Sequence, residues 1–236
     1  MRWAEGTTIA ESLSTTAHKG DTYHEVLFSA SRRRAGLSCF CYLVAITPRA
    51  SATQQTIPLN VSLDDVLSIN ATVTVLQSQI TNGQLTLTAT ISGTAVVNGI
   101  SAAVSSQPLT VTASATCKGG SGTLILTTSS LQLSLSNGLT ATVDPLMLTA
   151  TASCGKTPTL TVTASPGKVT LSDKTVLSTS QCSATLSSPS STTIGSAVCD
   201  LQNLICQLSD ILNSGATGDP VDVLNQLLTK LTMTLR

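Results

Sequence analysis

The residues that could carry out acid–base, metal or nucleophilic chemistry are unevenly distributed in this sequence. Both histidines and all three glutamates lie within the first 25 residues, and the chain after position 52 contains neither residue type. A chain without His or Glu lacks the usual general base, the Ser-His-Asp triad, the His-based metal site and the Glu pair of glycosidases. The sequence therefore predicts no catalytic, cofactor or metal residues, and a protein that is not an enzyme.

Two short patterns could still suggest chemistry. Ser165-Pro-Gly-Lys168 fits the bare S-x-x-K pattern of Ser-Lys acylases, in which an amine activates the hydroxyl. No S-D-N or K-T-G motif accompanies it, and the central Pro-Gly favours a turn between strands. Asp64-Asp65 could bind calcium, but no D-x-D-x-D-G loop surrounds it, and a solvated start of a helix or strand explains it better.

The charge balance excludes one class of partner. The chain carries 12 basic and 12 acidic residues, and only 10% of its residues are charged. Nucleic-acid binding needs a basic surface to neutralise phosphates. We therefore expect no nucleic-acid partner.

The N-terminal 52 residues resemble a leader. Arg32-Arg33-Arg34 precedes the apolar run 35–46, and Ala50-Ser51-Ala52 follows it. A positive segment, a short apolar run and an A-x-A site are typical of a signal peptide, and this run is too short to span a bilayer. We predict a signal peptide at 30–52, cleavage after Ala52, secretion and no membrane span. Residues 1–29 fit no part of a signal and are interpreted as a non-native or mis-started extension.

The segment 53–193 is predicted to form an antiparallel β domain. From residue 71 onward, apolar residues alternate with Ser and Thr, as in half-buried strands. Asn82-Gly83, Asn98-Gly99 and Asn137-Gly138 separate such runs, and Asn-Gly favours type I′ hairpin turns. We expect a sandwich-like or curved sheet, with further strands at 139–152 and 158–164, an edge or bulge at Pro145 and a loop at 178–193.

The segment 194–236 is predicted to be an α-hairpin of the same domain, packed on the sheet. Its apolar residues change to helical spacing, with the first stripe formed by Ile194, Val198, Leu201, Leu204, Ile205, Leu208, Ile211 and Leu212. Asp219 and Pro220 predict the cap and first residue of the second helix. Leu224, Leu227, Leu228, Leu231 and Leu235 supply its apolar face.

Five cysteines follow the predicted leader: Cys117, Cys154, Cys182, Cys199 and Cys206. Export makes disulfides the expected state, and the odd number leaves at least one thiol outside any pair within the chain. Cys199 and Cys206 would lie about 10 Å apart on one helix and could not bond to each other there. The remaining pairings stay open on this argument.

Three segments resemble a known group of proteins: 71–85, 111–117 and Leu201-Gln-Asn-Leu-Ile-Cys-Gln-Leu-Ser-Asp-Ile-Leu-Asn-Ser-Gly215. They are similar to a widespread group of uncharacterised secreted bacterial proteins, which carry one Cys before a leucine-rich strand and another in a late leucine-rich helix. The resemblance implies a disulfide between Cys117 and Cys206. The additional cysteines and the polar segment 118–122 depart from the pattern, and the group supplies no activity.

These observations favour a non-enzymatic secreted structural or interaction protein whose extracellular partner, or self-association, is unknown. The alternative is an extracellular carrier of an apolar ligand, held between the sheet and the leucine-rich helices.

Overall fold

The computed structural model describes residues 55–63 and 65–235, which contain twelve strands and two helices. The predicted extension 1–29 and signal peptide 30–52 lie outside the described residues. The described part is mainly β, with an antiparallel sheet and two C-terminal helices packed on it, as the sequence predicts. None of the helices in this part of the chain is long and apolar enough to cross a membrane.

The first four strands form an antiparallel meander in sequence order. They are β1 (Thr56–Leu63), β2 (Leu67–Thr81), β3 (Gln84–Val97) and β4 (Ile100–Lys118). The turns β2–β3 and β3–β4 are the predicted Asn-Gly pairs, and Asn82, Gly83, Asn98 and Gly99 all have the positive φ of a type I′ turn.

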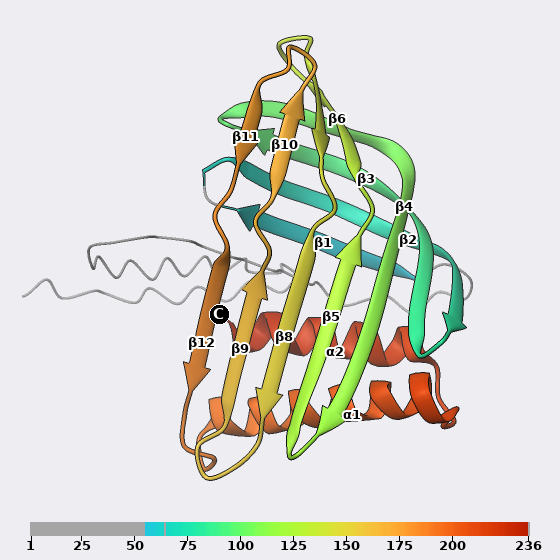
Figure 1. Cartoon of the computed structure of the whole chain (residues 1–236), viewed down its shortest axis with the longest axis vertical. Coiled ribbons are helices and arrows are strands. Elements are labelled where there is room, and N and C mark those ends of the chain that lie inside the picture. Colours follow the sequence, from blue (N-terminus) through green and yellow to red (C-terminus); the bar gives the residue numbers. More distant parts are fainter. Residues whose placement is uncertain (1–54, 64, 236) are drawn as a thin grey trace, which may run out of the picture. The chain divides into compact units, whose positions relative to one another are not determined.

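The remaining eight strands form two sets that extend the sheet from the other edge of β4, with neighbours that are not all consecutive in the sequence. We call the sets lower and upper after their places in Figure 1. The lower set lies in the order β4-β5-β8-β9-β12, and the upper set lies in the order β4-β6-β7-β10-β11. The lower strands are β5 (Ser121–Thr128), β8 (Met147–Ser153), β9 (Thr159–Ala164) and β12 (Cys182–Ser187). The upper strands are β6 (Leu131–Leu135), β7 (Thr140–Val143), β10 (Lys168–Leu171) and β11 (Val176–Ser178).

Each lower strand continues into an upper one after a short break (Figure 1). The breaks lie side by side across the sheet, and we call this line the waist; it comprises residues 129–130, 144–146, 165–167 and 179–181. Below the waist the sheet is covered by the helices, and above it β1 and β2 pass across the upper strands (Figure 1).

Two apolar cores follow from this arrangement. One lies above the waist and combines residues of β1 to β4 with residues of the upper strands, such as Ile69, Ile91 and Leu133. The other lies below it and combines the lower strands with both helices, through residues such as Leu124 and Leu201. The fold is therefore a curved sheet that is sandwich-like at one end and covered by helices at the other.

The two helices lie in the predicted segment, and the second one is capped by Asp219 and begins at Pro220 as predicted. In α1 (Thr193–Ser214), the Thr192 hydroxyl accepts a hydrogen bond from Gly195 N–H at 3.0 Å, and Gly215 ends the helix in the left-handed region. In α2 (Pro220–Thr234), Asp219 accepts from Val221 N–H at 2.8 Å. Ile194, predicted on the apolar stripe, is instead 47% exposed.

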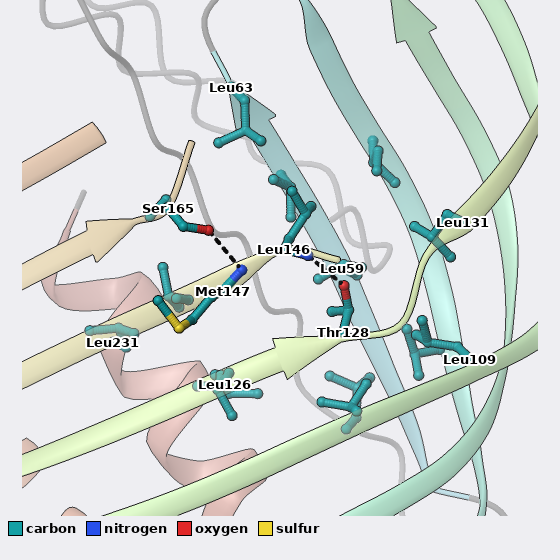
Figure 2. Close-up of a pocket in the computed structure, with 18 of the residues that line it drawn as sticks. Leu59, Leu63, Leu109, Leu126, Thr128, Leu131, Leu146, Met147, Ser165 and Leu231 are labelled. Carbon is teal, nitrogen blue, oxygen red and sulfur yellow. Dashed lines mark hydrogen bonds between the residues drawn. The ribbon is translucent and has the colours of Figure 1, made fainter. Parts of the chain in front are cut away.

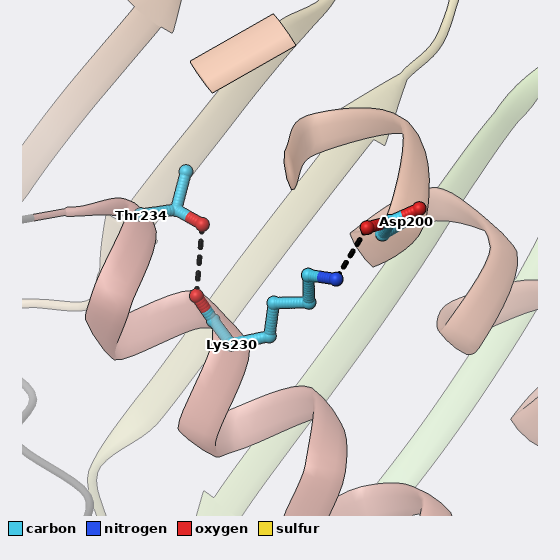
Figure 3. Close-up of polar contacts among 3 residues, drawn as sticks. All are labelled: Asp200, Lys230 and Thr234. Carbon is cyan, nitrogen blue, oxygen red and sulfur yellow. Dashed lines mark hydrogen bonds and ion pairs between the residues drawn. The ribbon is translucent and has the colours of Figure 1, made fainter. Parts of the chain in front are cut away.

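An ion pair links the two helices on their outer side. Lys230 of α2 contacts Asp200 of α1, and the Thr234 hydroxyl donates to the Lys230 carbonyl one turn away (Figure 3). Both charged side chains keep much of their surface in water, so the pair contributes at most about 1 kcal/mol. Apolar packing and the disulfides therefore hold the helices in place.

Both disulfides join α1 to the sheet. Cys117 at the end of β4 bonds to Cys206, the pair implied by the resemblance, and Cys154 after β8 bonds to Cys199. Cys182 is buried and takes part in neither disulfide. Close approach of the helix needs Gly122, because a Cβ there would lie 3.0 Å from the Ile205 side chain.

Three predictions about strands and turns are wrong in detail. The expected loop 178–193 contains β12, which pairs with β9 as an edge strand; its Ser/Thr content reflects an exposed outer side rather than a loop. The expected strand 139–152 is divided into β7 and β8 around Pro145, which cannot donate to the ladder. Asn137-Gly138 lies in a wider turn closed by Leu135 N–H to Leu139 O, and only Gly138 has positive φ.

Candidate functional site

The strand β1 supplies one wall of a cavity and was not predicted from the sequence. Its inward residues Ile57, Leu59, Val61 and Leu63 alternate with polar residues and Pro58, and all four line the cavity. The period of two was visible there, and a proline is compatible with an edge strand.

The opposite walls come from the lower strands and from α2. Leu126 of β5, Leu148 of β8 and Val162 of β9 face the cavity from the sheet. From α2 and its C-cap come Leu224, Leu228, Leu231 and Leu235, whose spacing of four, three and four residues places them on one helix face. The cavity therefore lies where the two apolar cores meet, at the waist (Figure 2).

The cavity has a volume of about 140 Å³. Met147 lines it and is 45% exposed, which places this side chain at the opening. An apolar cavity of about this volume accommodates a group of the size of benzene. The enclosed part thus fits a segment of an acyl chain, and the remainder of a longer ligand would extend through the opening.

The lining contains almost no polar atoms. Of its side chains only Thr128 and Ser165 carry a hydroxyl, and none of the described lining residues is ionisable. Thr128 Oγ1 accepts a hydrogen bond from Leu146 N–H, and Ser165 Oγ accepts one from Met147 N–H, both at 3.2 Å (Figure 2). The two hydroxyls therefore complete backbone hydrogen bonding where the ladder is interrupted.

The structure places the residues singled out in the sequence as follows. Ser165 lies at the waist with its hydroxyl bonded to Met147 N–H, and Lys168 is exposed as the first residue of β10. The segment connects two strands as expected, but β9 and β10 continue in one direction, so it is a break in a strand and not a hairpin turn. Asp65 is exposed in the turn before β2, and Asp64 lies outside the described residues.

Comparison with known proteins gives no match: no protein family, no curated protein and no solved structure is significantly similar to the chain.

Proposed function

We propose that this protein is a secreted, non-enzymatic binder of an apolar ligand, which it holds between the sheet and α2. The observation that carries the proposal is the aliphatic cavity at the waist. Protein interiors are packed with few voids, and aliphatic side chains that face water or empty space lose favourable burial and contacts. A ligand that fills the space offsets this loss.

Secretion is supported by the leader-like segment before residue 53 and by the disulfides. Two cross-links between α1 and the sheet are typical of proteins that fold in an oxidising compartment. An extracellular protein that binds an apolar molecule would keep that molecule out of water.

The alternative function is a structural or interaction module that binds no small ligand. It is favoured by the outer face of the lower strands, where hydroxyls pair across the sheet without charge. Thr123 and Thr151 lie 3.2 Å apart, and Thr161 and Thr185 lie 3.3 Å apart, measured between hydroxyl oxygens. Such pairs stabilise the sheet surface and need no ligand.

Native mass spectrometry of the gently purified protein distinguishes the two functions. We expect an additional mass from a bound apolar molecule. Ala164→Leu extends a side chain into the cavity and should remove most of that additional mass. Thr163→Leu is the matched control, because neighbouring residues of a strand point to opposite faces. A clean mass for the unmodified protein, obtained without detergent or organic solvent, would favour the structural module.

A further inference from the structure

The two hydroxyls of the cavity indicate what polar group its ligand carries. Thr128 and Ser165 lie on opposite sides of the chain segment 146–147, at the same level of the waist (Figure 2). In each case the hydroxyl oxygen already accepts a backbone N–H. Each side chain can still donate its own O–H proton and keeps one further lone pair.

Neither proton has an acceptor among the residues that the structure describes. The Leu146 and Met147 carbonyls accept the backbone N–H groups of Thr128 and Ser165, at 2.9 Å and 2.8 Å, and not the hydroxyl protons. A hydroxyl that faces an apolar cavity without donating loses part of its hydrogen bonding. These two O–H groups are therefore the only hydrogen-bond donors among the described side chains that line the cavity, and each can bind an acceptor on a ligand.

The charge of the lining restricts that acceptor further. No described lining residue is basic, so an ionised carboxylate would enter the cavity without a counter-charge. No described lining residue is acidic either, so an ammonium group would be equally unpaired. Transfer of an isolated charge into apolar surroundings is strongly unfavourable, whereas a neutral carbonyl needs only a donor.

We propose that the ligand is a neutral acyl ester, whose chain lies against the leucines and whose ester carbonyl accepts a hydrogen bond from Thr128 or Ser165. This inference rests on the proposed function, since it assigns the ligand of the same cavity. It excludes free fatty acids in their ionised form as the preferred ligand.

Three probes of similar chain length test the proposal: hexane, methyl hexanoate and hexanoate, each titrated at pH 7 into protein expressed from the full-length sequence. Binding is followed by the methyl resonance of ¹³C-labelled methionine. Met147 lines the cavity, and Met233, which is 61% exposed on α2, serves as the internal reference. We expect methyl hexanoate to bind about fivefold more tightly than hexane, as one hydrogen bond allows, and hexanoate to bind most weakly.

Removal of the hydroxyls should abolish the difference. Thr128→Val with Ser165→Ala should bring the affinity for methyl hexanoate to within twofold of the affinity of the same variant for hexane. Ser129→Ala is the matched control, because the Ser129 hydroxyl accepts Thr110 N–H at 3.0 Å and does not line the cavity. This control should keep the preference for the ester. If the double variant does not fold, the single variant Ser165→Ala is measured instead. It should lose part of the preference for methyl hexanoate over hexane.

The possible failures are distinguishable. Equal binding of hexane and methyl hexanoate to the unmodified protein, or tightest binding of hexanoate, would overturn the ester assignment while the proposed function stands. No shift of the Met147 resonance with any probe would overturn both.

Discussion

At the waist, single hydroxyl groups replace the backbone hydrogen bonds that the broken strands cannot make. Thr128, Ser129, Ser165 and Thr179 each accept a backbone N–H from a neighbouring strand or break, at 2.7–3.2 Å. A backbone N–H that is removed from water needs an acceptor, and at these four positions a side-chain hydroxyl supplies it. Ser and Thr therefore have two roles in the described part of the chain. Many cover the outer surface of the sheet, and the four named here satisfy backbone N–H groups at the waist.

Thr179 is the most buried of these residues, at 5% exposure, and its loss should be costly. Thr179→Val keeps the shape of the side chain but leaves Gly167 N–H, bonded at 2.7 Å, without its acceptor. We expect a loss of about 1–3 kcal/mol in the free energy of unfolding, measured by urea denaturation.

Thr88→Val is the matched control, because Thr88 is exposed on the outer face of β3 and is β-branched in the same way. It should change stability by less than about 0.5 kcal/mol. Equal effects of the two substitutions would show that the hydroxyl at the waist has no special role.

At the scale of elements, the waist is marked in the sequence by a change in which positions of the alternating pattern are apolar. Buried residues have even numbers in β5 and β9, such as Leu124 and Leu160, and odd numbers in β6 and β10, such as Leu133 and Val169. The buried positions therefore shift by one residue across each break. This shift allows the strand segments on both sides of the break to bury the same face of the sheet. Individual strands and both helices could be predicted because their patterns are local. The changes of alternation at the breaks and the edge strands β1 and β12 could not be predicted, because they depend on pairing with strands that are distant in the sequence.

The position of α1 should depend on its two disulfides. Cys117–Cys206 has a sequence separation of 89, but with Cys154–Cys199 in place it closes a loop of only about 45 residues. Loss of this cross-link should lower the free energy of unfolding by about 4 kcal/mol by the chain-entropy argument. We expect this for the paired substitution Cys117→Ser and Cys206→Ser, measured under non-reducing conditions by circular dichroism.

The second pair provides the comparison. Cys154→Ser with Cys199→Ser removes a cross-link of sequence separation 45 and should have a similar effect. Strand signal that persists while helix signal melts at lower urea would show that the disulfides hold α1 on an otherwise stable sheet. A loss below about 1 kcal/mol for either pair would show that leucine packing alone positions the helix.

At the scale of the whole described domain, the cavity results from closing one curved sheet in two different ways. Above the waist the sheet folds onto itself, and below it the helices cover it. Side chains of the two cores meet at the waist, where the described residues supply aliphatic side chains and no aromatic ring to fill the space. The leucine face of α2 can be predicted from the sequence, but such a face is equally compatible with a fully packed core that has no cavity. The cavity therefore follows from the three-dimensional closure and could not be predicted from that face.

The aromatic residues give a test of export that is independent of the cavity. All five lie before residue 52: Trp3, Tyr23, Phe28, Phe40 and Tyr42. Cleavage after Ala52 would leave an extracellular protein that begins at Thr53 and contains neither Trp nor Tyr. Its absorbance near 280 nm should then come almost entirely from disulfides.

The measurement compares extracellular protein with precursor that accumulates when signal peptidase is inhibited, at concentrations fixed by amino-acid analysis. Precursor made from the full sequence keeps Trp3, Tyr23 and Tyr42, and precursor that lacks the extension 1–29 keeps Tyr42, so either should absorb more strongly per molecule than the extracellular form. The extracellular form should give Thr53 as its first residue on N-terminal sequencing. Strong tyrosine or tryptophan absorbance in the extracellular form would show that the leader is retained. Retention would also change the proposal for the ligand site, because the apolar run 35–46 would remain attached to the strand that forms one wall of the cavity.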